Sequence, residues 1–83
     1  MQTYYFTFGI SPDFPYQDGW IEIQAPTMGQ AMITFSKKYP HPKHNVLNCA
    51  FIYDERQFRA TRMYKEGNFG RRCHETIRWG ESE

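Results

Sequence analysis

The chain has 83 residues and a formal net charge of +1 at pH 7, and 40% of its residues are hydrophobic and 18% aromatic. This length allows one domain with a small core, which we assign to residues 1–83. No apolar run approaches the ~20 residues needed to span a bilayer. A charge so close to zero argues against a dedicated non-specific nucleic-acid binder, a class that is usually strongly basic.

Two segments near the N-terminus alternate apolar and polar side chains, which is typical of strands. They are residues 2–8 and residues 20–25, and the segment between them, residues 11–19, contains two prolines and an Asp-Gly pair, as loops do. We expect the two strands to form a hairpin joined by this long loop. The side chains expected to face the core are Tyr4 or Phe6, Ile21, Ile23 and Ala25.

A helix is predicted directly after the second strand. Thr27 is a good N-cap, and Gln30 stands at the capping-box spacing from it. One apolar stripe at helical spacing follows, made of Met28, Ala31, Met32, Phe35 and Tyr39. Pro40 is expected to stop the helix.

The C-terminal half is less regular. Residues 46–53 form a nearly continuous apolar run, which predicts a central strand buried on both faces. Asp54 and Gln57 repeat the capping-box spacing and favour a short helix, but residues 58–64 also alternate like a strand, so both interpretations stay open. Residues 71–79 alternate and predict a final strand.

The predicted fold class is therefore α+β, in the order β-β-α-β-(short α or β)-β. It is a four-stranded, mostly antiparallel sheet with one amphipathic helix packed on one face, against the hairpin and Leu47 or Phe51. The other face carries Tyr5 and Trp20. A partner surface, a dimer interface and cover by a loop are equally consistent with these aromatic side chains. Monomer and homodimer both stay open.

The metal-like residues are His41, His44, Cys73 and His74, whose nitrogen and sulfur ligands suit zinc. Their spacing matches no standard zinc site, so solvated histidines are the simpler interpretation. Cys49 lies in the most apolar segment and is expected in the core, and the alternation of the last strand predicts burial of Cys73 as well. Arg72 and His74 beside Cys73 would favour a nucleophilic thiolate if Cys73 were exposed, but the expected burial of both thiols opposes it. A disulfide between the two is the less favoured alternative. We expect no enzyme activity and no cofactor.

Basic residues are concentrated in the C-terminal half. Residues 1–36 contain no Lys or Arg, and residues 37–83 contain all ten. The candidate partner-binding residues are Arg56, Arg59, Arg62, Lys65, Arg71, Arg72 and Arg78. The first four recur every three residues and would form one stripe on a helix. Such a stripe can be a solvated face balanced by Glu55 and Glu66, a surface for an acidic protein, or, with nearby aromatic rings, a surface for single-stranded nucleic acid.

Three segments carry a resemblance to a known group of proteins. They are Tyr4 to Gly9 (YYFTFG), Trp20 to Ala25 (WIEIQA) and Ala50 to Glu55 (AFIYDE). With the helix between them, they resemble a family of short uncharacterised proteins encoded by bacteriophages and other mobile elements, over roughly residues 2–58. The shared positions are core positions of strands and helix, so no site residue can be transferred. After Phe58 this chain is longer and more basic than the family pattern.

The resemblance implies an accessory factor that binds and blocks a host defence complex, and anti-CRISPR proteins are the leading class of such factors. The first hypothesis is therefore a non-enzymatic inhibitor of a CRISPR–Cas effector that acts by steric block. The second is a small nucleic-acid-binding module that uses the Arg-rich half, and the third is a zinc-binding or cysteine-dependent enzyme. We find no secretory signal, so the expected location is the cytosol of a bacterial host, and no membrane partner is expected.

Overall fold

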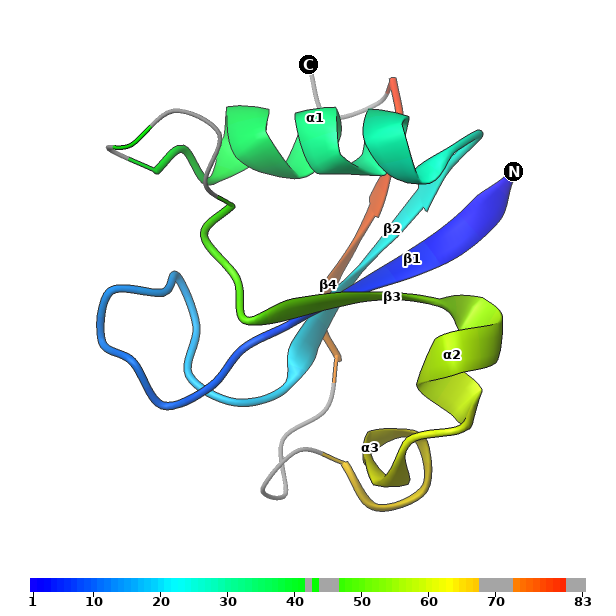
Figure 1. The fold of residues 1–83 in the computed structure, drawn as a ribbon. Coiled ribbons are helices and arrows are strands. Elements are labelled where there is room, and N and C mark those ends of the chain that lie inside the picture. Colours follow the sequence, from blue (N-terminus) through cyan, green and yellow to red (C-terminus); the bar gives the residue numbers. More distant parts are fainter. Residues whose placement is uncertain (42, 44–46, 68–72, 81–83) are drawn as a thin grey trace.

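The computed structural model describes residues 1–41, 43, 47–67 and 73–80. Within them a four-stranded sheet carries the main helix on one face, and two short helices lie on the other side of the sheet (Figure 1). The elements are β1 (Gln2–Thr7), β2 (Trp20–Ala25), α1 (Met28–Lys38), β3 (Phe51–Asp54), α2 (Glu55–Arg59), α3 (Arg62–Glu66) and β4 (Cys73–Arg78). The predicted α+β fold is confirmed.

The strands lie in the order β3-β1-β2-β4. β1 is antiparallel to β2 and to β3, so the predicted N-terminal hairpin is confirmed, whereas β4 runs parallel to β2. The loop of the hairpin is closed by hydrogen bonds from the Phe8 amide to the Gly19 carbonyl (3.1 Å) and from the Asp18 amide to the Gly9 carbonyl (2.9 Å). The sheet is thus mixed but mostly antiparallel.

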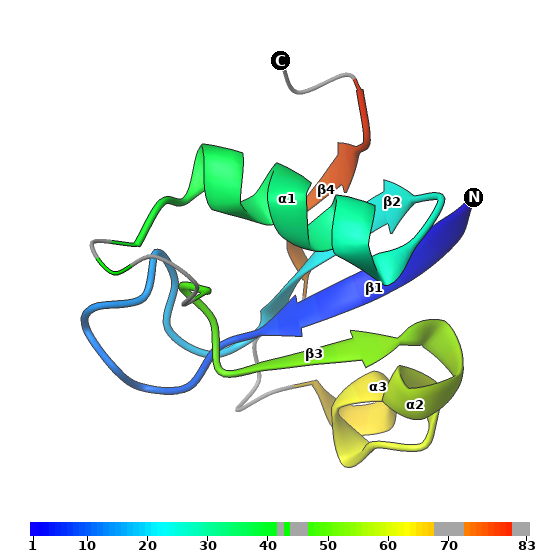
Figure 2. The same ribbon diagram turned by 45° about the horizontal axis from the view of Figure 1, so that its top comes forward.

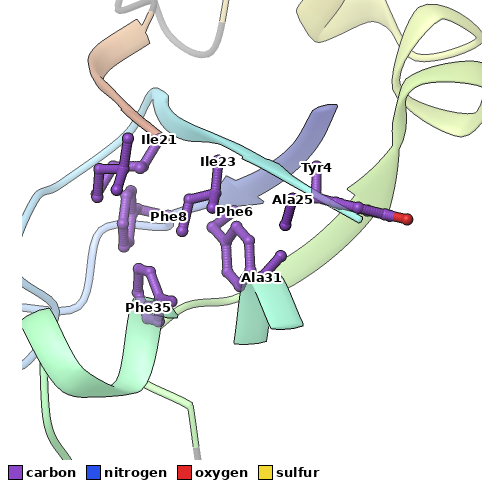
Figure 3. Packing of buried hydrophobic residues seen from close by; sticks show 9 residues of the cluster. Tyr4, Phe6, Phe8, Ile21, Ile23, Ala25, Ala31 and Phe35 are labelled. Atoms are coloured by element: carbon purple, nitrogen blue, oxygen red, sulfur yellow. The ribbon is translucent and has the colours of Figure 1, made fainter. Parts of the chain in front are cut away.

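α1 begins and ends where the sequence predicts. The Thr27 hydroxyl accepts a hydrogen bond from the Gln30 amide, which satisfies one of the free donors at the helix start. Ala31 and Phe35 of α1 are fully buried, and the Phe35 ring stacks on Phe6 of β1 with 4.7 Å between ring centroids. Figure 3 shows these α1 side chains pointing into the layer formed by Phe8 and the hairpin residues.

The opposite face of the sheet is covered by α2. The Phe58 ring stacks on Tyr5 with a centroid distance of 4.1 Å and meets the Trp20 ring edge-on at 4.8 Å. Tyr5 and Trp20 are consequently 9% and 6% exposed. Cover by a segment of the same chain is therefore the alternative that the structure selects for these two rings, and Figure 2 shows α1 and α2 on opposite sides of β1 and β3.

The prediction of a central strand over residues 46–53 is wrong. β3 spans only Phe51–Asp54, lies at the edge of the sheet, and leaves the Phe51 ring 65% exposed. Residues 47–50 form no strand, and residue 46 lies outside the described part of the chain. The run is apolar for another reason, because Leu47 and Cys49 pack against the α1 core from the segment that precedes β3.

Two further expectations change in the C-terminal half. Residues 55–59 and 62–66 are helices, so the alternative of a strand over residues 58–64 is wrong. Cys73 is exposed, against the prediction of burial. The reason is a register shift between Trp20 and Ile21: Cys73 pairs with Trp20 and Glu75 with Ile21, which puts two residues of the same alternation phase on opposite faces.

The predicted final strand is present as β4, which ends at Arg78, one residue earlier than predicted, and Trp79 follows it in a turn. Residues 71 and 72 lie outside the described residues. Among the helices described, none is long and apolar enough to cross a membrane.

Candidate functional site: a basic and aromatic surface on β3, α2 and α3

The short helices are held in place by local caps and one anchor. The Asp54 carboxylate accepts a hydrogen bond from the Gln57 amide (2.7 Å), and the Gln57 side chain accepts one from the Asp54 amide (3.1 Å). This reciprocal pair starts α2 immediately at the end of β3. Phe58 is the buried residue of α2, so the rest of the helix faces solvent around that single contact.

α3 continues from α2 after a tight connection. The Thr61 amide donates to the Phe58 carbonyl at 3.0 Å, and the Thr61 hydroxyl donates to the same carbonyl at 2.6 Å. Gly67, with φ +80°, ends α3 in a conformation that favours glycine. The two helices are therefore separate five-residue segments, and the basic residues spaced every three positions do not lie on one continuous helix.

A path of aromatic rings runs from β3 across α2 to α3. Phe51 and Tyr53, Tyr53 and Phe58, and Phe58 and Tyr64 each have ring centroids 6.3 Å apart. The two ends of the path are open to solvent, with Phe51 65% and Tyr64 47% exposed. We call the exposed aromatic and basic side chains of these elements, together with the half-buried Tyr53, the β3–α2–α3 surface; its residues are Phe51, Tyr53, Arg56, Arg59, Arg62, Tyr64 and Lys65.

The cations of the β3–α2–α3 surface are of two kinds. Arg59 pairs with Glu55 at 3.3 Å and Arg62 pairs with Glu66 at 3.2 Å, each one helical turn apart. The Arg59 guanidinium also lies 5.7 Å from the centroid of the Tyr64 ring, which is cation–π distance. Arg56 and Lys65 have no ion-pair partner among the residues that the structure describes, so they carry the uncompensated positive charge.

Of the remaining three candidate residues, the structure describes only Arg78, which does not join this surface. Arg78 lies on β4, and β4 and β3 are at opposite edges of the sheet. Arg71 and Arg72 lie outside the described residues. Of the seven predicted residues, four are therefore placed together on α2 and α3, and one is placed away from them.

Three of the four metal-like residues, His41, Cys73 and His74, lie in the described part of the chain, and they form no metal site there. Within residues 1–41, 43, 47–67 and 73–80, no group of three or more His, Cys, Asp or Glu side chains could hold a metal ion, and His44 falls outside those ranges. His74 is engaged in packing instead: its ring stacks on Tyr16 at 4.2 Å, and its Nε2 lies 2.6 Å from the Asp18 carbonyl oxygen.

Both thiols are free and neither is activated. Burial raises the pKa of the Cys49 thiol to about 12. Cys73 is exposed as a residue, but its sulfur is partly screened from water beside Glu22, and this desolvation raises its pKa as well. A nucleophilic cysteine needs the opposite shift, because the thiolate is the reactive form.

Sequence reasoning missed one polar cluster, which joins α1 to β4. The Glu75 carboxylate accepts hydrogen bonds from the Lys38 ammonium (2.7 Å) and from the Tyr39 hydroxyl, and Tyr16 from the hairpin loop reaches the Tyr39 hydroxyl at 3.5 Å. No sequence spacing signals this contact, since Glu75 lies far along the chain from its partners.

The protonation states in this cluster argue for a structural role. Burial alone would raise the pKa of the Glu75 carboxyl, but hydrogen bonds from Lys38 and Tyr39 and the charge of Lys38 outweigh it, so that pKa is lowered. Burial, helped by the hydrogen bond to Glu75, raises the pKa of Tyr39. Both groups thus keep their ordinary charge near neutral pH, whereas a general acid or base works best with a pKa near the working pH.

Comparison of the chain with protein-family models, with curated protein sequences and with solved structures found no match in any of the three. The resemblance to phage proteins therefore stays a prediction. What the site can do is argued below from its own residues.

Proposed function

We propose that the chain is a non-catalytic interaction protein that binds and inhibits a host defence complex through the β3–α2–α3 surface. The phage resemblance suggests a CRISPR–Cas effector as the target, so the chain would act as an anti-CRISPR protein in the bacterial cytosol. Inhibition would be by steric block, since binding alone covers part of the effector. No group on this surface has to react.

The observation that carries the proposal is the exposed aromatic and basic side chains of β3, α2 and α3. Tyr, Phe and Arg are the residue types enriched at protein–protein interfaces, and Arg and Tyr dominate their energetic centres. Tyr64 with Arg59 against its ring is such a pair, and Phe51 adds an apolar ring that is 65% exposed. An acidic face on the partner would complement Arg56 and Lys65.

The test is co-purification with candidate CRISPR–Cas effector complexes, followed by phage infection of cells that carry them. The wild-type chain is expected to form a stable complex with one effector and to restore infection. The double variant Arg56→Glu/Lys65→Glu is expected to lose both effects, because it reverses the uncompensated charge of the surface. Lys43→Glu is the matched control for each single substitution, Arg56→Glu and Lys65→Glu, since it makes the same change of charge on an exposed residue outside the surface. No complex with any effector, or full activity of the double variant, would refute the proposal.

A nucleic-acid-binding role is the second candidate. Exposed rings beside arginines are the arrangement on which single-stranded bases stack, and Phe51 and Tyr64 with Arg59 fit this description. Against it, Arg59 and Arg62 already have carboxylate partners on their own helices. A gel shift with oligothymidylate at two salt concentrations decides: nucleic-acid binding must weaken steeply as salt rises.

A further inference from the structure

β3 has a free edge. It pairs with β1 on one side and is the terminal strand of the sheet, so within the described residues no strand lies on its other side (Figures 1 and 2). An edge strand presents unpaired backbone N–H and C=O groups, and these form a template for another extended chain. Its side chains alternate between the two faces of the sheet, with Phe51 and Tyr53 on the side of α2.

The two edges of the sheet differ in how they are protected. β4 carries Glu75 and Arg78 and contains a register irregularity, and charges and bulges are the usual devices that keep an edge from pairing. Residues 51–53 of β3 are Phe, Ile and Tyr, with no basic residue and no proline. The devices left at β3 are its shortness, four residues, and the single carboxylate of Asp54 at its end. The β3 edge is therefore the more open to an added strand.

The segment from the end of this edge through α3 has a small excess of positive charge, because residues 54–66 contain four basic and three acidic side chains. The only acidic residue of β3, Asp54, already accepts the Gln57 amide as the cap of α2. Two residues beyond the strand end stands Arg56, which is exposed and has no ion-pair partner among the described residues. Lys65 on α3 is likewise exposed and has no ion-pair partner among the described residues. An incoming segment with carboxylates is thus favoured over a basic or neutral one.

We propose that the β3 edge receives an extended acidic segment of a partner protein as a fifth strand. The inference rests on the proposed function and specifies how the partner is held. Backbone groups of residues 51–53 provide the directional hydrogen bonds, since the Asp54 amide already donates to the Gln57 side chain. Apolar side chains of the segment contact Phe51 and Tyr53, and its carboxylates meet Arg56 and Lys65. A polypeptide matches a strand edge better than a nucleic acid does, because only its backbone supplies regularly spaced amide donors and acceptors.

A capped hexapeptide in which glutamate alternates with valine is the probe. Titrated into the isotope-labelled full chain, it should shift the amide resonances of residues 51–53 and slow their hydrogen exchange. Three matched ligands accompany it: the same peptide with lysine in place of glutamate, the same peptide with alternate amides N-methylated, and an oligothymidylate of about ten nucleotides. The Arg56→Glu/Lys65→Glu variant should bind the acidic peptide about tenfold more weakly, whereas Lys43→Glu should not.

The proposal is supported if only the acidic, unmethylated peptide binds and its effects concentrate on residues 51–53. It is overturned if the peptide does not bind at about millimolar concentration, if it perturbs other residues, if the methylated or lysine peptide binds equally well, or if oligothymidylate binds more tightly. If the wild-type chain captures an effector but the peptide does not bind, strand addition is refuted and the proposed function is not. Capture that survives the double charge reversal would refute the proposed surface itself.

Discussion

Glu75 ties β4 to the end of α1 through its contacts with Lys38 and Tyr39. Replacing Glu75 by Gln keeps the shape of the side chain but removes the negative charge to which Lys38 and Tyr39 donate hydrogen bonds. We expect Glu75→Gln to lower the free energy of unfolding at pH 7 by about 1 kcal/mol, a discounted value because the Lys38 side chain is 41% exposed. Urea denaturation measures it, and Glu66→Gln, in an exposed pair on α3, is the control with a smaller effect.

The pH dependence of this difference has a definite sign. The pKa of Glu75 is lowered in the folded state, so the folded chain holds fewer protons than the unfolded chain in the acid range. The contribution of Glu75 is complete above its unfolded pKa, near 4.5, and is lost as the pH falls through the folded value. Wild type and Glu75→Gln should therefore converge in stability at acid pH. A difference that stays constant or grows there would contradict the assigned contacts.

The two thiols should differ in reactivity. Burial raises the pKa of Cys49 to about 12, whereas Cys73 is exposed and its pKa is raised less. With a disulfide-exchange reagent at mildly alkaline pH, we expect Cys73 to react in a fast phase and Cys49 in a separate, slower phase, because only the thiolate attacks and Cys49 is both buried and less ionised. Cys73→Ser should remove the fast phase and Cys49→Ser should retain it. Two fast phases in the wild type would contradict the burial of Cys49.

At the scale of elements, α2 depends on one side chain. Phe58 is 1% exposed and is the buried residue that connects α2 to Tyr5 and Trp20. Phe58→Ala is expected to destabilise the chain by about 3 kcal/mol, the range for a large aromatic removed from a core. Measured in a Trp79→Phe background, Trp20 fluorescence should shift to the red as its ring becomes exposed. Met63→Ala, at a partly buried neighbour, should cost much less, and an unshifted Trp20 spectrum in Phe58→Ala would show that another segment covers this face.

The elements that the sequence predicts correctly are those with local signals. The alternation in β1 and β2 and the stripe and cap of α1 involve residues close together in the chain, so pattern and structure agree. The capping box at Asp54 also marked α2. The apolar run before Asp54 led to a wrong prediction of a strand, because buried residues in a strand and buried residues outside one are equally apolar. Leu47 and Cys49 pack against the core but belong to no strand.

The candidate site was predictable in part for the same reason. Arg56, Arg59, Arg62 and Lys65 follow the capping signal and were placed on a helix, and Glu55 and Glu66 were named as their counter-charges, as the pairs with Arg59 and Arg62 show. The break between α2 and α3 depends on local geometry and was not predicted. The parallel placement of β4 beside β2, which moves Arg78 away from the others, is a long-range choice with no signature in sequence spacing. The same choice brings Glu75 to Tyr39.

At the scale of the whole molecule, the sheet order determines what becomes of the charge asymmetry along the chain. The acidic N-terminal half provides the two central strands, and the basic C-terminal half provides the strand at each edge. The halves therefore interleave, and no simple division into a negative and a positive face follows. Positive charge is concentrated locally instead, on α2 and α3, which is why the proposed interface involves a small part of the molecule.

The interleaving also predicts how the chain unfolds. The α1 core and the Phe58 cluster lie on opposite faces of the same two central strands, with Phe6 in one and its neighbour Tyr5 in the other. Loss of either cluster removes support from β1 and β2, so we expect a single cooperative transition in urea, with a slope of about 1 kcal/mol per molar for a chain this small.

The measurement follows both faces of the sheet at once. Trp20 fluorescence, recorded in a Trp79→Phe background, reports the Phe58 cluster, and far-ultraviolet circular dichroism reports mainly α1, the longest helix described. Coincident midpoints are expected, and Phe58→Ala should move both midpoints together because the two clusters share β1 and β2. If Trp20 becomes exposed at a lower urea concentration than α1 unfolds, then α2 and α3 detach on their own and the second face is not part of the cooperative core.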